Sequence, residues 1–304
     1  MIDYQAILDT ITNSLKHSAV KGEVASYIPE LSNVKEDNFG MYLNLVDGNK
    51  FGSGDWDKPF SIQSISKVLT LSRAVPLVGN KIFERVDVEP SGNPFNHMAL
   101  LELEKGIPRN PLINSGAIVI ADMLLSHLEN PKEDFLQYVR DLTNDQSINY
   151  NEKVASSEAE TGFNNYAAAN LLKSFDNLEN EVDDVLDFYF HQCSIEMTCE
   201  QLSNAFYLFA NRGKCMRNTA HLTLNQVKRI NAIMLTCGFY DEAGEFAFEV
   251  GLPGKSGVGG GIAALLPNEF TITCWAPGLN EKGNSYLGMQ ALELFTTQTK
   301  RSIF

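Results

Sequence analysis

The chain has 304 residues, of which 44% are hydrophobic and 20% are charged, and this is the composition of an ordinary folded protein. Its 38 acidic and 24 basic residues give a formal net charge of -14, a field that repels nucleic-acid backbones and anionic membrane surfaces. The length favours one large domain or two closely packed lobes. We therefore expect a globular protein that binds neither nucleic acid nor membrane.

Targeting and metal-binding patterns do not stand out in the sequence. The first residues (MIDYQ) lack the features of a secretory signal, and no run approaches the roughly 18 apolar residues of a membrane span. The five cysteines show no C-x-x-C spacing, and the five histidines are isolated from one another. We expect a cytoplasmic protein without disulfides, metal or cofactor.

The N-terminal part of the chain predicts a helix, a hairpin and a second helix. Residues 5–17 place apolar side chains on one face at helical spacing. Residues 39–52 contain two strand-like runs joined by an Asp-Gly-Asn turn, which favours a hairpin. Residues 64–77 change to helical periodicity, and we expect Pro76 to end that helix. The change from strand to helix falls at Ser64.

Helical periodicity dominates the middle of the chain, and strand signals return after Tyr240. The runs EFAFEVGLP, SGVGGGIAALLP and FTITCWAP are rich in strand formers, and a helix follows over residues 284–299. Acidic residues between 176 and 187 are interpreted as a solvated helix face. The predicted middle helices cover residues 114–127, 132–142, 164–174, 180–190, 198–211 and 224–237.

Strands at both ends around a helical middle predict an α+β fold. We expect an antiparallel sheet built from both chain ends with flanking helices, and a helical lobe inserted between them. Residues 1–66 and 238–304 would form the sheet-containing lobe, and residues 67–237 the mostly helical lobe. The active site is expected between the two lobes.

Ser64-Ile65-Ser66-Lys67 is an S-x-x-K motif, whose spacing places the hydroxyl and the amine one helical turn apart. A lysine acts as a base only when it is neutral, which requires burial or neighbouring positive charge. The same spacing occurs at Ser18 and at Ser32, so the spacing alone is weak evidence. Only Ser64 stands at a strand-to-helix change, where a nucleophile is well presented.

Lys255-Ser256-Gly257 is the K-[ST]-G motif of the chain and opens a glycine-rich run. Serine-lysine acyl transferases need a strand beside the nucleophile, and glycines there allow the backbone to approach an oxyanion. A glycine-rich strand that merely packs under a helix is the structural alternative. The two motifs in this order suggest a β-lactamase/transpeptidase-like fold. No S-D-N motif follows the serine, so β-lactamases and transpeptidases themselves fit poorly.

The sequence resembles the glutaminase family, in its short bacterial form, over about residues 20 to 290. The resemblance implies hydrolysis of L-glutamine to L-glutamate and ammonia without a cofactor, by a homodimer or homotetramer. The matching blocks are Tyr27–Leu31, Gln63–Lys67, Glu89–Gly92, Asn110–Pro111, Asn114–Ile118, Ser157–Gly162, Asn165, Asp187–Phe190, Cys193–Glu196, Cys237–Tyr240 and Gly251–Val258.

The resemblance also implies catalytic roles. Ser64 is the nucleophile that the glutamine side chain acylates, and Lys67 takes its proton and returns it to the leaving ammonia. Tyr27 and Tyr240 match the tyrosines placed around this pair, with their individual roles left open. The backbone N–H groups of Ser64 and Val258 match the oxyanion hole.

The substrate-binding positions follow in the same way. Glu158 matches the counterion of the α-ammonium group, and Asn114, Asn165 and Tyr189 match donors to the α-carboxylate. Ser64, Tyr240 and Val258 are also expected to contact the substrate, and Gln63 and Lys255 are further candidates. Without the resemblance, helix capping or core packing would explain the four binding side chains equally well.

Two rival interpretations stay open. One is a serine-lysine amidase or esterase acting on another small amide, such as asparagine or a γ-glutamyl compound. The other is a metabolite-binding protein that keeps the pocket without turnover. The presence of Ser64, Lys67, Tyr240 and Lys255 together argues against the binding protein.

Overall fold

A computed structural model describes residues 2–92 and 98–304. Its main sheet has five strands in the order β3-β2-β9-β8-β7, and all of its strand pairs are antiparallel. Strands from the two chain ends meet at the β2–β9 pair, and this confirms the predicted sheet. The strands are β2 (Gly40–Leu45), β3 (Lys50–Gly54), β7 (Gly254–Ser256), β8 (Gly261–Leu266) and β9 (Phe270–Trp275).

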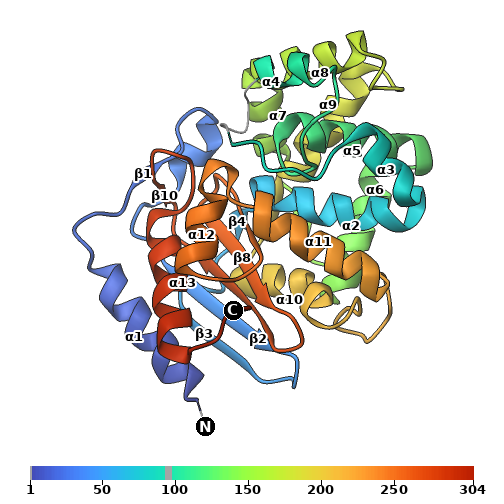
Figure 1. The fold of residues 1–304 in the computed structure, drawn as a ribbon. Helices are drawn as coiled ribbons and strands as arrows, with labels where there is room; N and C mark the ends of the chain where they lie inside the picture. Colours follow the sequence, from blue (N-terminus) through green and yellow to red (C-terminus); the bar gives the residue numbers. More distant parts are fainter. Residues whose placement is uncertain (1, 93–97) are drawn as a thin grey trace.

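Helices cover both faces of this sheet (Figure 1). Helices α1 (Tyr4–Lys16) and α13 (Tyr286–Thr299) pack on one face, where they bury alternate side chains of β8 and β9. Helix α10 (Cys199–Ala210) packs on the other face, where the Ser203 and Thr271 hydroxyls lie 2.7 Å apart. Because both faces are buried, β8 is a continuous apolar run, whereas β9 carries the buried Thr271 and Thr273 on the face toward α10.

Most helices of the middle of the chain gather in a group, here called the helical lobe, in the upper right of Figure 1, whereas α10 packs on the sheet. Helix α2 (Ser66–Val78) contacts α5 (Asn114–His127) and α9 (Val182–Cys193) in a large apolar core. The remaining helices are α3 (Ile82–Arg85), α4 (Met98–Leu103), α6 (Pro131–Thr143), α7 (Glu152–Thr161), α8 (Phe163–Ser174), α11 (Leu224–Cys237) and α12 (Ala243–Glu249).

Short elements connect the lobe and the sheet. Strand β6 (Ile195–Met197) lies between β4 (Phe60–Ser61) and β5 (Asn149–Tyr150) in a small sheet, so the segment just before Ser64 pairs with the helical middle of the chain. The other short elements are β1 (Glu23–Val24), β10 (Gly278–Leu279) and the 3-10 helices η1 (Pro29–Asn33), η2 (Gln63–Ile65), η3 (Gly79–Lys81) and η4 (Tyr240–Glu242).

Two predicted boundaries are wrong. Pro76 lies inside α2, which continues to Val78. A proline in the last turn of a helix removes only one backbone hydrogen bond, and the chain turns off at Gly79, whose φ is 68°. The run EFAFEVGLP contributes to helix α12 and not to a strand, because Phe246 and Val250 are four residues apart and both face the core.

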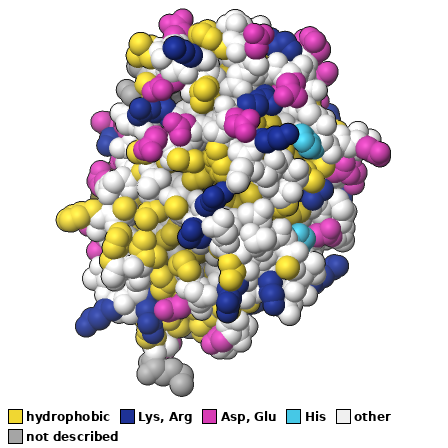
Figure 2. Space-filling view, turned by 45° about the vertical axis from the view of Figure 1, so that its right-hand side comes forward, with side chains coloured by type: hydrophobic (Ala, Val, Ile, Leu, Met, Phe, Trp, Pro, Cys, Tyr) yellow, Lys and Arg dark blue, Asp and Glu magenta, His cyan; other side chains and the backbone are white. Residues whose placement is uncertain are grey.

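Acidic and apolar side chains gather in different parts of the molecular surface. Figure 2 shows acidic side chains over the upper part of one face and apolar side chains gathered in its middle. Among residues 2–92 and 98–304, none of the helices has the length and apolarity needed to cross a lipid bilayer.

Candidate active site

Ser64 is presented at the junction of β4, η2 and α2, as the strand-to-helix change predicted. Between Phe60 and Ser72 it is the one residue that is not buried. The residue before it, Gln63, has a φ of 49°, a conformation that non-glycine residues rarely adopt and that costs about 1–3 kcal/mol. Such a sharp turn exposes the Ser64 hydroxyl while the helix behind it stays buried.

Lys67 lies one turn along α2 and is completely buried. Burial lowers the pKa of Lys67 to about 8, against the opposing effects of Cys193 and Glu158. Its Nζ donates a hydrogen bond of 2.6 Å to Oδ1 of Asn114. With such a pKa, about one lysine in ten is neutral at pH 7 and able to accept a proton.

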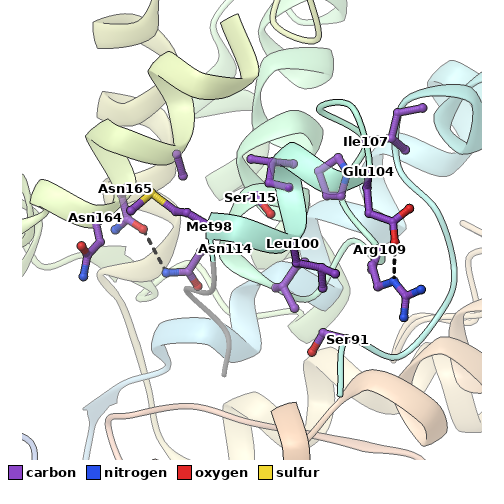
Figure 3. Close-up of a pocket in the computed structure, with 14 residues that line it drawn as sticks. Ser91, Met98, Leu100, Glu104, Ile107, Arg109, Asn114, Ser115, Asn164 and Asn165 are labelled. Atoms are coloured by element: carbon purple, nitrogen blue, oxygen red, sulfur yellow. Dashed lines mark hydrogen bonds and ion pairs between the residues drawn. The ribbon is translucent and has the colours of Figure 1, made fainter. Parts of the chain in front are cut away.

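Asn114 links Lys67 to the far side of the site. It is the first residue of α5, and its Nδ2 donates to Oδ1 of Asn165 on α8 at 2.9 Å, as Figure 3 shows. The sequence suggested only a donor to substrate, but the carbonyl oxygen of Asn114 is committed to Lys67. Among the residues that the structure describes, the second N–H of Asn114 and the Asn165 amide nitrogen form no hydrogen bond, so both can donate to a ligand.

A second, small cavity lies beside this pair. It shares Asn114, Asn164 and Asn165 with the larger cavity that contains Ser64 and Glu158. Its far side is lined by the Glu104–Arg109 ion pair, whose N–O distance is 3.1 Å (Figure 3). The Asn114–Asn165 hydrogen bond therefore forms part of the wall of both cavities.

Tyr240 forms the opposite wall, and Lys255 lies behind it. Tyr240 has a φ of 55°, and burial raises the pKa of its phenol to about 12, against a hydrogen bond with Ser64 that lowers it. The Nζ of Lys255 lies 4.1 Å from the centroid of the Tyr240 ring and donates to the Ser256 carbonyl oxygen at 2.7 Å. Burial, and next the charge of Lys67, hold the pKa of Lys255 well below its usual range.

Glu158 supplies a negative group inside the same site. Its side chain is buried, and within the described part of the chain its Oε1 has no hydrogen-bond partner. Burial raises the pKa of Glu158 to about 7, while Gln63 and then Lys67 act in the opposite direction. A buried carboxylate oxygen without a donor is costly, so this position is suited to a cationic ligand group.

The cavity that these residues surround has a volume of about 520 Å³. Lys67 and Lys255 lie behind its wall, whereas Tyr27, with 56% of its surface exposed, lies on its rim. Cys193, Ile28 and the segment 161–164 also line it and were not singled out as site residues, although Ile28, Cys193, Thr161 and Gly162 lie within the matching blocks. The predicted site residues lining the cavity are Tyr27, Gln63, Ser64, Asn114, Glu158, Asn165, Tyr189, Tyr240 and Val258.

The turn between β7 and β8 packs closely against Ser64. A Cβ added at Gly257 would lie 2.5 Å from the Ile62 carbonyl oxygen and 3.4 Å from the Ser64 backbone nitrogen. Only glycine permits this approach. Val258, the next residue, lines the same cavity as Ser64.

Metal-ligating side chains are scattered in the structure. Among the described residues, no group of three or more His, Cys, Asp or Glu side chains is placed to hold a metal ion. The predicted isolation of the histidines includes His97, which lies outside the described residues.

Comparison with known proteins places this chain in a family. The family model described as Glutaminase matches residues 22–304. A glutaminase from Christiangramia forsetii is 54% identical over 304 residues and one from Aliarcobacter butzleri is 50% identical over 305, and each match covers 100% of both chains.

Solved structures agree with the sequence relatives. A probable glutaminase superposes with a TM-score of 0.94 at 33% identity, covering 99% of this chain and 98% of that one. A probable glutaminase from Bacillus subtilis, complexed with 6-diazo-5-oxo-L-norleucine, gives a TM-score of 0.90 at 32% identity, covering 100% and 97%. With a Ser64–Lys67 pair beside a closely packed K-S-G strand, the chain belongs to the glutaminase family of amidohydrolases.

Proposed function

We propose that this chain hydrolyses the side-chain amide of L-glutamine through an acyl-enzyme on Ser64, with Lys67 as the general base. The observation that carries the proposal is the pairing of two features in one cavity. The accessible Ser64 hydroxyl lies in the same cavity as a buried Glu158 oxygen that has no hydrogen-bond partner among residues 2–92 and 98–304. A substrate with an amide at one end and an ammonium group at the other satisfies both.

The reaction proceeds in two halves. The Ser64 oxygen attacks the amide carbon while neutral Lys67 takes the hydroxyl proton, and Lys67 then gives that proton to the departing ammonia. The negative oxygen of the intermediate accepts hydrogen bonds from the backbone N–H groups of Ser64 and Val258. Water next attacks the glutamyl ester, loses a proton to Lys67, and glutamate leaves as the proton returns to Ser64.

The tyrosines have different positions and therefore different roles. With a pKa of about 12, Tyr240 stays protonated at neutral pH and donates a hydrogen bond at the reacting centre, next to Ser64. Lys255 supports the ring of Tyr240 from the side of β7. Tyr27 lies on the exposed rim of the cavity and covers the bound substrate.

A covalent complex is known for the Bacillus subtilis enzyme, formed by its reaction with 6-diazo-5-oxo-L-norleucine.

Recognition of the amino-acid end uses the opposite wall of the cavity. Glu158 pairs with the α-ammonium group, and Asn165, Tyr189 and the remaining N–H of Asn114 donate to the α-carboxylate. Gln63, whose amide nitrogen donates to the Ser61 hydroxyl at 3.0 Å, stays a lower-ranked binding candidate. This arrangement favours the L enantiomer. In D-glutamine the α-ammonium and α-carboxylate groups exchange positions, which would place the substrate carboxylate against the Glu158 carboxylate.

The setting of the enzyme is also proposed. The cavity is lined by residues from 1–66 and 238–304 on one side and from 67–237 on the other, which supports an active site between two lobes. The five cysteines are buried and free of disulfides, which suits the reducing cytoplasm. Exposed apolar side chains, among them Phe248 and Phe304 with 85% and 84% of their surfaces exposed, support a homodimer or homotetramer.

The test is ammonia release by the purified protein from L-glutamine, D-glutamine, L-asparagine and a γ-glutamyl amide. We expect L-glutamine to be turned over and Ser64→Ala to remove the activity while the protein stays folded. Ser32→Ala is the matched control, because Ser32 has the same S-x-x-K spacing but lies exposed in η1. Turnover confined to another amide would change the substrate, and full activity of Ser64→Ala would refute the mechanism.

A further inference from the structure

A second buried carboxylate lies next to the site and has no place in the chemistry described so far. Glu242 follows Tyr240 by two residues, and only 7% of its surface is exposed. Within the described residues no Lys, Arg or His forms an ion pair with it. Acids are rarely buried without a cationic partner, so this position calls for an explanation.

Neutral amides satisfy this carboxylate. The Asn280 amide nitrogen donates to Oε1 at 3.0 Å and to Oε2 at 2.9 Å, and the Asn284 amide nitrogen donates to Oε2 as well. Both asparagines belong to the turn between β10 and α13. An ionised carboxylate only accepts hydrogen bonds, so it fixes which end of each amide faces it.

The side chain of Asn284 connects Glu242 to Ser256 on strand β7. With its nitrogen held by Glu242, Asn284 turns Oδ1 toward the Ser256 hydroxyl, which donates to it. Asn284 and Ser256 are both completely buried. Ser256 follows Lys255 in the K-S-G strand, and its carbonyl oxygen accepts the hydrogen bond from the Lys255 amine.

The same segment carries the strained Tyr240. Its left-handed backbone conformation is one that tyrosine adopts only when neighbouring contacts hold it. Three hydrogen bonds hold the backbone on either side of it: the Glu242 nitrogen donates to the Phe239 carbonyl oxygen at 2.9 Å, the Asn284 amide nitrogen to the same oxygen at 3.5 Å, and the Ser256 nitrogen to the Gly238 carbonyl oxygen at 3.3 Å. The hydrogen bonds from Glu242 through Asn284 to Ser256 connect the two ends of the segment 238–242, because Ser256 in turn bonds to Gly238.

We propose that Glu242 is a positioning residue for the reaction, acting through Asn284 and Ser256 to hold the Tyr240 ring over the Lys255 amine and the Tyr240 hydroxyl at Ser64. Glu242 itself lies outside the residues that line the cavity and touches no reacting atom. The inference rests on the role proposed above for Tyr240.

The test compares Glu242→Gln with Glu245→Gln, the same chemical change at an exposed acid three residues further on. A glutamine keeps the volume but has one acceptor oxygen, so it cannot hold both asparagine amides as the carboxylate does. We expect Glu242→Gln to lower kcat for L-glutamine about 10- to 100-fold, as misplacement of a reacting group does, while KM changes less than about threefold. Glu245→Gln should keep both constants.

A double-mutant cycle separates positioning from a general loss of structure. In a Tyr240→Phe background the Glu242→Gln change should cost little further activity, because the hydroxyl that it positions is gone. An equal loss in both backgrounds, or a kcat of Glu242→Gln equal to that of Glu245→Gln, would overturn the inference. If Glu242→Gln does not fold, Ser256→Ala breaks the same chain of bonds and enters the same cycle.

The experiments distinguish a failure of the role proposed for Tyr240 from a failure of the role inferred for Glu242. A Tyr240→Phe variant with the parental kcat would remove the proposed role of Tyr240 and the inference together. A slow Tyr240→Phe variant combined with an unaffected Glu242→Gln variant would remove only the inference.

Discussion

Replacing Glu158 by glutamine should stabilise the free protein and weaken the binding of its substrate. Burial raises the pKa of Glu158 from an ordinary value of 4.5 to about 7. At about 1.4 kcal/mol per pKa unit, ionised Glu158 costs the free fold about 3 kcal/mol relative to the unfolded chain. The glutamine side chain keeps the shape without the charge, so we expect a gain of about 1–3 kcal/mol at pH 8.

The stability gain of Glu158→Gln should depend on pH. Between pH 4.5 and about 7 the folded carboxyl binds a proton that the unfolded one has released, so the penalty grows as pH rises through this window. The stability gain of Glu158→Gln should therefore be full above pH 7 and vanish near pH 4.5. Thermal unfolding at the two pH values measures it, at about 2–4 °C in Tm per kcal/mol.

Binding should change in the opposite direction. Loss of a charge-assisted contact with the α-ammonium group is worth about 1.5–3 kcal/mol, so KM for L-glutamine should rise about 10- to 100-fold with a smaller change in kcat. Glu160→Gln, at an exposed position on the same helix, is the control for both measurements. The reasoning would be refuted if the stability gain of Glu158→Gln over the parent were smaller at pH 8 than at pH 5. An unchanged KM for L-glutamine would refute it as well.

Further predictions concern the proton acceptor and its partner. Lys67→Arg should fold but lose about 10²- to 10⁴-fold in kcat, because a guanidinium stays protonated; ammonia release near the parental rate would contradict Lys67 as base. In the parent, kcat/KM should rise with pH through about 7 and again through about 8, as Glu158 and then Lys67 lose their protons, and a flat profile from about pH 6 to pH 9 would disagree. Asn114→Ala should lower kcat and raise KM together, since it removes the partner of Lys67 and a wall of the cavity; the exposed Asn170→Ala on α8 is the comparison, and steady-state kinetics would expose an effect on one constant alone.

Much of the fold was predictable because its signals are local. Periodicity placed α5 and α11 at their observed bounds, and the Asp-Gly turn placed the β2–β3 hairpin. Helix α12 was missed, because the alternating Glu, Phe and Ala of that segment match a strand and a short helix equally well. The contact of Phe239 with Phe246, whose ring centroids are 3.6 Å apart, favours the helix, and no local pattern reports such a contact.

By itself the sequence determined the nucleophile candidate, the order of its motifs and the family, because motif spacing and strand-to-helix changes are properties of short segments. Only the tertiary structure decided that Lys67 is held by Asn114, that Glu158 has an oxygen without a partner in the described part of the chain, and that Glu242 reaches Ser256 through Asn284. These features depend on burial and on contacts between segments far apart in the chain. Desolvation and hydrogen-bond partners arise only when those segments pack together.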